Sequence, residues 1–252
     1  MTIQTVFDQI NQLAPFQTQM GFDNAGILIG SPQKSVTKIG VVLDVTMEAV
    51  EYAASHGIDL IVSHHPVIFT GLKSIDGDSV VYRLIQKNIG VISAHTNLDA
   101  AEQGVNQVLA QTLELTQVEP LALPGEVTPP MGRVGTLPKA MDCQTFAQYV
   151  NQKLGTRVKF VNTGKPVSKV AVCGGAGEDF ILPALAVGAD ALVTADVKHH
   201  NFLLAASLKI ALMDAGHFET ERVIVPVLQE CLAKQLEIPV VEIPQTSPVE
   251  YA

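Results

Sequence analysis

The chain is poor in the features that mark nucleic-acid-binding, secreted and membrane proteins. Its 252 residues carry 16 Lys and Arg against 25 Asp and Glu, a net charge of −9, with no basic cluster that would track a phosphate backbone. No run approaches the roughly 18 apolar residues of a membrane span, and no basic segment followed by an apolar one opens the chain. We therefore expect a cytoplasmic protein with no membrane association and no nucleic-acid partner.

Cysteine is scarce, and apolar residues are abundant. Cys143, Cys173 and Cys231 are isolated, odd in number and without a C-x-x-C pair, which favours inert thiols in a reducing compartment. The composition is 47% hydrophobic and 16% charged. A buried parallel sheet together with large subunit contacts accounts for this excess, so we expect a homo-oligomer.

The interpretation of the rest of the chain depends on one stretch, residues 60–69. Its apolar run Leu60-Ile61-Val62 is typical of a buried strand, which ends at the adjacent histidines His64 and His65 before Pro66. Ligands bind at the carboxyl ends of strands in open α/β sheets, where both imidazoles can turn into one crevice. The alternative is a pair of loop histidines that only bond the backbone.

Strands alternate with helices in both halves, which predicts parallel sheets with right-handed crossovers. In the first half we expect helices at 5–13, 46–56, 80–88 and 101–115, and strands at 39–43, 59–62 and 91–94. Prolines at 120, 124, 129 and 130 then indicate a linker. In the second half we expect helices at 143–154 and up to 187, and strands at 158–161, 169–173, 191–193 and 210–214.

The two halves also align without a gap. Lys38 falls on Lys169, Gly57 on Gly188, Asp59 on Asp190 and Val62 on Val193. We interpret the chain as two tandem, structurally similar α/β domains with mainly parallel sheets, spanning residues 1–126 and 127–252.

Each half places a histidine four residues before a carboxylate, between a strand end and the following helix. These pairs are His95 with Asp99 and His217 with Glu221. Residues at i and i+4 share a face on a first helical turn. Together with His64 and His65, the set offers six imidazole and carboxylate donors without thiolate, which suits zinc, manganese, iron or cobalt. Six donors exceed one tetrahedral site, so two divalent ions sharing a bridging carboxylate are expected.

Four motifs together resemble one protein family. They are Asp23-Asn24-Ala25-Gly26, Ser63-His64-His65-Pro66, His95-Thr96-Asn97-Leu98-Asp99 and Gly216-His217-Phe218-Glu219-Thr220-Glu221. In this order they resemble the Nif-three-like dinuclear-metal family, whose members are also labelled type-two GTP cyclohydrolase I homologues. The segment from Leu115 to Asp142 is too short for the extra middle domain of longer members, so the chain resembles the short form.

The resemblance implies a fold, an assembly and a set of ligands. Two α/β domains would face each other across a dinuclear metal cleft, and the chain would assemble as a hexameric ring. The metal ligands would be His64, His65, Asp99, His217 and Glu221, with Glu221 bridging. His95 would be a neighbour that orients a ligand or moves protons.

Three other segments permit two interpretations each, and the structural one is favoured. Asp23 and Asn24 are expected to bond local backbone. Residues 196–200 are expected to start a helix with solvated His199 and His200, the alternative being a substrate-facing loop. Cys173-Gly174-Gly175-Ala176-Gly177 lacks the ending of a phosphate-binding loop, which favours an ordinary glycine turn.

The leading hypothesis is a metal-dependent hydrolase that uses metal-bound hydroxide on a nucleotide-like or other small substrate. Only the resemblance points to GTP cyclohydrolase chemistry. The alternative from another class is a non-enzymatic ring that binds metal or a partner, its ions closing the cleft. Association of such a ring with DNA is a third hypothesis, against which the net charge of −9 argues.

Overall fold

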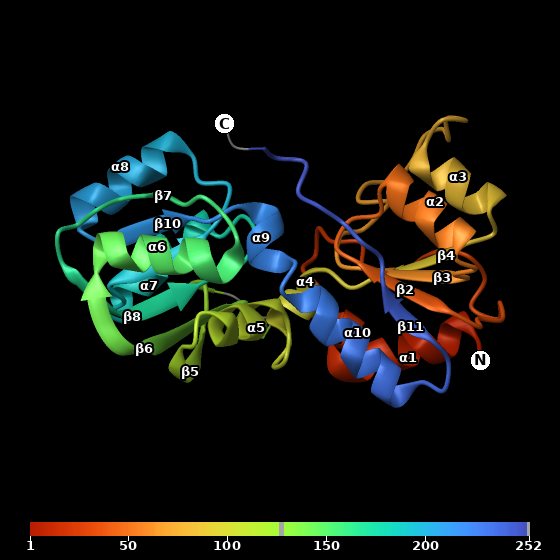
Figure 1. The fold of residues 1–252 in the computed structure, drawn as a ribbon, viewed down its shortest axis with the longest axis horizontal. Coiled ribbons are helices and arrows are strands. Elements are labelled where there is room, and N and C mark those ends of the chain that lie inside the picture. The colour runs from red at the N-terminus through yellow and green to blue at the C-terminus, as the bar shows by residue number, and fades with distance from the viewer. Residues whose placement is uncertain (126–128, 251–252) are drawn as a thin grey trace. The chain divides into compact units, whose positions relative to one another are not determined.

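The computed structural model describes residues 1–125 and 129–250, and the chain divides into two compact units (Figure 1). Unit 1 comprises residues 1–101 and 225–246, and unit 2 comprises residues 102–224 together with those from 247 onward. Each unit has one β-sheet with helices on its faces, which confirms the predicted α/β class. The boundary expected between residues 126 and 127 lies outside the described residues and stays a prediction, as does the facing of the two domains.

The sheet of unit 1 is parallel except at one edge. Its order is β1 (Gly26–Ile29), β4 (Gly90–Ser93), β3 (Leu60–Ser63), β2 (Ile39–Val42) and β11 (Val240–Glu242). Only β1 runs antiparallel to its neighbour, β4. The expected strands at 39–43, 59–62 and 91–94 are therefore confirmed to within a residue.

Helices cover both faces of this sheet (Figure 1). They are α1 (Ile3–Leu13), α2 (Met47–Ser55), α3 (Val80–Gln86), α4 (Thr96–Ala100) and α10 (Ile224–Gln235), with a 3-10 turn at Phe16–Thr18. Thr46 and Ser79 start α2 and α3 by accepting bonds from backbone amides, as N-caps do. Leu84 of α3 and Val50 of α2 pack on one face with Ile61 of β3.

The sheet of unit 2 is mixed. Among the described residues its order is β5 (Thr116–Leu121), β6 (Gly132–Asp142), β8 (Pro166–Val172), β9 (Ala191–Thr194), β10 (Ala211–Asp214) and β7 (Lys159–Phe160). Strands β8, β9 and β10 are parallel, whereas β5, β6 and β7 pair antiparallel. The expectation of mainly parallel sheets thus holds for unit 1 and for the middle of unit 2.

The predicted linker after the first half is wrong in part, because β5 extends to Leu121 and includes the first of the prolines that indicate the linker. Pro120 is expected to break regular structure, but it lies on β5, the edge strand of the sheet. An edge strand tolerates proline because its outward N–H groups need no ladder partner. Pro120 therefore indicates the edge of a sheet.

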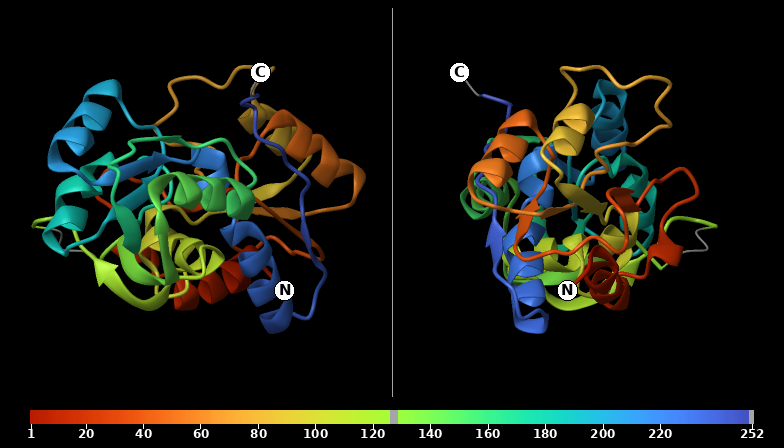
Figure 2. Two further views of the ribbon diagram at one scale, coloured as in Figure 1. Left: turned by 60° about the vertical axis from the view of Figure 1, so that its left-hand side comes forward. Right: turned by 90° about the vertical axis from the view of Figure 1, so that its right-hand side faces the viewer.

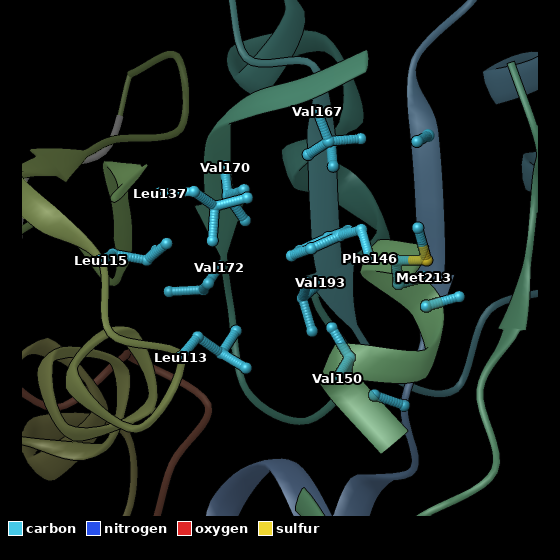
Figure 3. Packing of buried hydrophobic residues seen from close by; sticks show 14 of the residues in the cluster. Leu113, Leu115, Leu137, Phe146, Val150, Val167, Val170, Val172, Val193 and Met213 are labelled. Atoms are coloured by element: carbon cyan, nitrogen blue, oxygen red, sulfur yellow. The ribbon is translucent and has the colours of Figure 1, made fainter. Parts of the chain in front are cut away.

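Alternate residues of the unit 2 strands point to opposite faces, and each face has its own helices. Val170, Val172, Val193 and Met213 pack with Phe146 and Val150 of α6 (Cys143–Leu154), as Figure 3 shows. Helix α5 (Val105–Thr112) contributes to the same cluster. The intervening residues Ala171, Leu192 and Leu212 pack with α7 (Ile181–Ala186) and α8 (His199–Leu208). The period-two alternation of buried strands explains both cores.

The internal repeat is visible in hydrogen bonds. Asp59 Oδ2 accepts from the amides of Thr37 and Lys38, and Asp190 Oδ2 accepts from those of Ser168 and Lys169. The lysine ammonium groups match too, donating to the carbonyl oxygens of His56 and Val187, and each of the four residues in one copy lies 131 residues from its counterpart. The gapless alignment therefore describes one supersecondary unit folded twice.

Within the described residues every helix is too short or too polar to cross a bilayer.

Candidate metal centre

Three histidines meet at the carboxyl edge of the unit 1 sheet. His64 and His65 follow β3, and His95 comes two residues after β4. The two strands are parallel neighbours with Ser63 opposite Ser93, so their ends meet at one edge. The ring centroids lie 4.9 to 5.5 Å apart. Their ligating nitrogens all lie within 4.8 Å of one another, which confirms that both strand-end imidazoles turn to one place.

Each histidine of the predicted set is oriented by a bond from Nδ1 to an oxygen that can only accept. The pairs are His64 with the Ala94 carbonyl at 2.9 Å, His65 with Asp44 at 2.7 Å, His95 with Asp23 at 2.8 Å and His217 with Asp196 at 2.7 Å. Such acceptors place the ring proton on Nδ1, and the lone pair of a neutral imidazole then lies on Nε2. This tautomer suits metal coordination through Nε2.

In the first half Asp99 lies beside His64, and its backbone amide donates to the His95 carbonyl at 3.0 Å. Its Oδ1 lies 3.5 Å from His64 Nε2, and its side chain is buried. His95 precedes α4 as its N-cap, with φ −108° and ψ −109°, so it lies outside the helical turn. The Nδ1 of His95 bonds to Asp23, and Asp99 lies beside His64.

The second half forms the expected pair. His217 is the first residue of α9 (His217–Glu221), and its Nε2 lies 3.0 Å from Oε2 of Glu221. The two halves therefore differ by one residue: the N-cap position that His95 occupies in α4 belongs to Gly216 in α9.

The glycine turn after β8 shapes the pocket of Glu221. Its amides donate to side chains, from Gly174 to Asn106, from Gly175 to Thr220 and from Gly177 to Thr194, at 2.6 to 3.1 Å. These amides are therefore engaged, which confirms the ordinary glycine turn. A Cβ on Gly175 would collide with Oε1 of Glu221 and lie 3.2 Å from His217 Nε2. Gly175 thus leaves the space that the carboxylate occupies.

Asp23 has a larger role than the expected local bond. Its Oδ1 does accept from the Asn24 amide at 2.7 Å, but its carboxylate also accepts from His95 and from the amide and hydroxyl of Thr96. Burial by itself would raise its pKa, but the bonds from His95 and Thr96 outweigh this and lower the pKa of Asp23 to about 2. Asp23 is thus an ionised orienter of His95, for which the only signal in the sequence was the family-like motif that begins with it.

Asp196 is the second partner that sequence reasoning missed. It follows β9, at the position where the first half has its histidine pair, and has a left-handed φ of +53°. Its carboxylate holds His217. Helix α8 starts at His199, and both His199 and His200 are exposed, which confirms the helix-start interpretation of residues 196–200. Strain at Asp196 is of the kind that clusters at functional sites.

The donor set fits a borderline divalent cation. It consists of imidazoles and carboxylates, with no thiolate. None of the three cysteines, all within the described residues, forms a disulfide, and burial raises the pKa of Cys143 and Cys231. A metal ion in the unit 1 group would therefore be held by histidine nitrogen and carboxylate oxygen.

Comparison with known protein families and curated proteins places this geometry in context. A family model described as Duf34/NIF3 (NGG1p interacting factor 3) matches residues 1–248. A "GTP cyclohydrolase 1 type 2 homolog" of Clostridium perfringens is 29% identical over 244 residues, 94% of this chain and 93% of its own. A protein of that name from Streptomyces coelicolor is 32% identical over 232 residues, covering 87% and 81% of the two chains.

Longer relatives and solved structures agree with this similarity. The Staphylococcus epidermidis protein of the same name aligns over 345 residues at 25% identity, so it carries residues with no counterpart in these 252. The Staphylococcus aureus hypothetical protein SA1388 has a TM-score of 0.92 at 27% identity, covering 100% of this chain and 99% of that one. Reduced HcgD from Methanocaldococcus jannaschii has a TM-score of 0.83 at 27% identity, covering 97% and 98%.

Proposed function

The chain belongs to the Duf34/NIF3 family, and from that premise we propose that it is a metal-dependent hydrolase acting on a small, nucleotide-like substrate. Its curated relatives are named as GTP cyclohydrolase 1 type 2 homologs, which makes GTP the first substrate to test. The observation that carries the proposal is the shared orientation of four imidazoles, each held through Nδ1 by a fixed acceptor.

In this proposal five residues bind two divalent ions, zinc, manganese, iron or cobalt. They are His64, His65 and Asp99 of unit 1 and His217 and Glu221 of unit 2, with Glu221 bridging. When bound, the ions would supply a Lewis acid that lowers the pKa of water to about 7 and makes hydroxide available near neutral pH. Asp44 and Asp196 hold the rings of His65 and His217 in place.

His95 is assigned the movement of protons. Its Nδ1 is fixed by Asp23, an anion at neutral pH, so Nε2 is the ring nitrogen that would take up and release a proton. His95→Gln should therefore lower hydrolysis about 10²- to 10⁴-fold. Its metal content should stay at the wild-type value, and a loss of ions would make His95 a ligand instead.

The second candidate function is a non-enzymatic ring that binds metal or a protein partner. It shares the ligand set but needs no proton carrier. The Asp23–His95 pair, with its buried carboxylate and partly exposed imidazole, favours the enzyme. In either case we propose a cytoplasmic homohexamer, following the apolar composition and the family resemblance.

Elemental analysis of the native protein tests the metal site first, and the expected result is close to two divalent ions per chain. His64→Ala combined with His217→Ala should lower that number, because each loses one imidazole. His199→Ala combined with His200→Ala is the matched control, since both rings are exposed on α8. Full occupancy in the first double variant would remove the ligand assignment.

Hydrolysis is then measured with each candidate metal, starting from GTP and extending to other nucleotides, phosphoesters and amides. Turnover that disappears in the His95→Gln variant supports the enzyme. A fully metal-loaded protein that hydrolyses none of these compounds supports the non-enzymatic ring.

A further inference from the structure

Two phenylalanine rings beside the histidine group of unit 1 are exposed. Phe22 is 63% and Phe69 is 47% exposed, although burial of a phenyl ring is favourable. Their centroids lie 6.3 Å apart, with the rings tilted by 52°. The Phe69 ring is also 6.0 Å from the His95 ring, in an edge-on arrangement. The aromatic pair is therefore continuous with the candidate site.

The turn that carries Phe22 is fastened to the start of α4. The Met20 amide donates to the Thr96 hydroxyl at 2.9 Å, and the Thr96 amide donates to Asp23 at 3.0 Å. The turn is closed by a bond from the Asp23 amide to the Met20 carbonyl at 2.9 Å. Phe22 lies between these anchored residues, so its exposure is built into the backbone.

The segment that carries Phe69 is tied to the same turn. It belongs to residues 64–79, which form a long loop between β3 and α3 (Figure 2). The side-chain amide of Asn24 donates to the carbonyl oxygen of Ile68 at 2.6 Å. Both rings are thus fixed by neighbours of the site, and a surface ordered before binding loses less entropy when a ligand arrives.

We propose that Phe22 and Phe69 bind the planar heteroaromatic ring of the substrate by stacking and hold its reacting part beside His95. This inference rests on the proposed hydrolase function. Flat rings stack on aromatic side chains because both present a π-face, whichever polar groups they carry. Exposed phenyl rings also bind quaternary ammonium ions. The adjacent carboxylate, Asp23, is buried and bonded to His95 and Thr96, which favours a planar ring over a cation.

The absence of tryptophan from the sequence allows a direct test. Phe22→Trp introduces a single indole, and the metal-loaded variant is titrated with GMP while its fluorescence is followed. We expect saturable quenching by GMP and none by ribose 5-phosphate, which lacks the ring. Adding Phe69→Ala should weaken GMP binding about 5- to 150-fold, the range for loss of one base-stacking partner.

Ile85→Trp is the matched control, because Ile85 is exposed on α3, in the same unit. It should show only weak quenching that rises linearly with GMP. Equal quenching in both variants overturns the proposal, and so does displacement of GMP by choline at equal concentration. A changed mass of Phe22→Ala in light scattering would assign the rings to a protein contact and also overturn it. Quenching requires no turnover, so it tests ring binding separately from catalysis. Saturable quenching without hydrolysis would reject the proposed hydrolase function and support the proposed ring-binding site.

Discussion

Asp99 and Glu221 are the two carboxylates of the proposed ligand set, and their surroundings differ. Asp99 lies on α4 beside His64, in the half that supplies three histidines of the candidate site, whereas Glu221 pairs with His217, the one candidate-site histidine of its half. A carboxylate between two cations reduces their repulsion, and this effect is large where the dielectric constant is low. Since the family resemblance assigns the bridge to Glu221, the two should respond differently to neutralisation.

Glu221→Gln should therefore lose both ions, while Asp99→Asn should lose mainly one. Metal titration by calorimetry on the two purified variants measures this, with circular dichroism to establish that both are folded. Loss of both ions from Asp99→Asn and of one from Glu221→Gln would reverse the roles.

Gly175 offers a test of how Glu221 is held. Gly175→Ala adds a Cβ that collides with Glu221 Oε1, at a residue with φ +62°. We expect metal content to fall, together with a loss of about 1–3 kcal/mol in unfolding free energy from the strained backbone. Gly164→Ala is the matched control, because Gly164 has φ +68° and nothing within 4 Å of the added Cβ. It should be destabilised similarly but keep its metal, and equal metal loss in both would show that strain alone empties the site.

The histidine group could be predicted because its members follow the ends of neighbouring strands. The acidic partners could not, since Asp44 and Asp196 each lie 21 residues from the histidine they hold and Asp23 lies 72 residues from His95. Strand periodicity shows where a strand ends, but the acceptor that orients a ring is decided by loop conformation.

At the scale of elements, the repeat predicts matched energetics in its two copies. Asp59 and Asp190 each tie a strand start to the preceding strand through two backbone amides. Asp59→Ala and Asp190→Ala should each lower the unfolding free energy by about 1–3 kcal/mol, because two amides lose a charged acceptor. Urea denaturation measures the change, and exposed Glu237→Ala should be neutral. A neutral Asp190→Ala would mean that the shared bonds are incidental.

Acid should weaken the hydrogen bonds that Asp59 accepts from the backbone amides. Burial alone would raise the pKa of Asp59, but the bonds from Thr37 and Lys38 lower it below 3.8. A carboxylate with a depressed folded pKa stabilises the fold above its unfolded pKa, and the contribution is lost as pH falls through the folded one. The stability difference between wild type and Asp59→Ala should therefore shrink below about pH 3.8, and a constant difference down to pH 2 would contradict it.

Most elements were predictable because buried parallel strands read as short apolar runs. The errors lie where one signal has two structural meanings. Prolines that indicated a linker belong partly to an edge strand, and the helix expected at 101–115 is α5 at 105–112, which starts after Gly104. Intrinsic propensity does not determine these bounds, because they depend on the position of a strand in its sheet and on the residue that caps a helix.

At the scale of the whole molecule, the sequence offered no sign that residues 225–246 belong to unit 1. Strand β11 completes its sheet by pairing with β2, some 200 residues earlier in the chain. Hydrophobic periodicity identifies the face that a strand buries but not its neighbour. The order of strands therefore had to come from the structure.

Composition predicts an assembly larger than the monomer, a symmetric oligomer that we expect to be a hexamer. Leu182 and Leu185 of α7 and Leu203 and Leu204 of α8 remain exposed, and such groups of apolar side chains mark contact surfaces. Light scattering at micromolar concentrations should give a mass of about six chains. Leu203→Glu should shift it to smaller species, because an interface would bury the new charge without a partner, whereas the exposed Gln86→Glu on α3 should not. A wild-type monomer across this concentration range would reject the oligomer, and an unchanged hexamer in Leu203→Glu would place its contacts elsewhere.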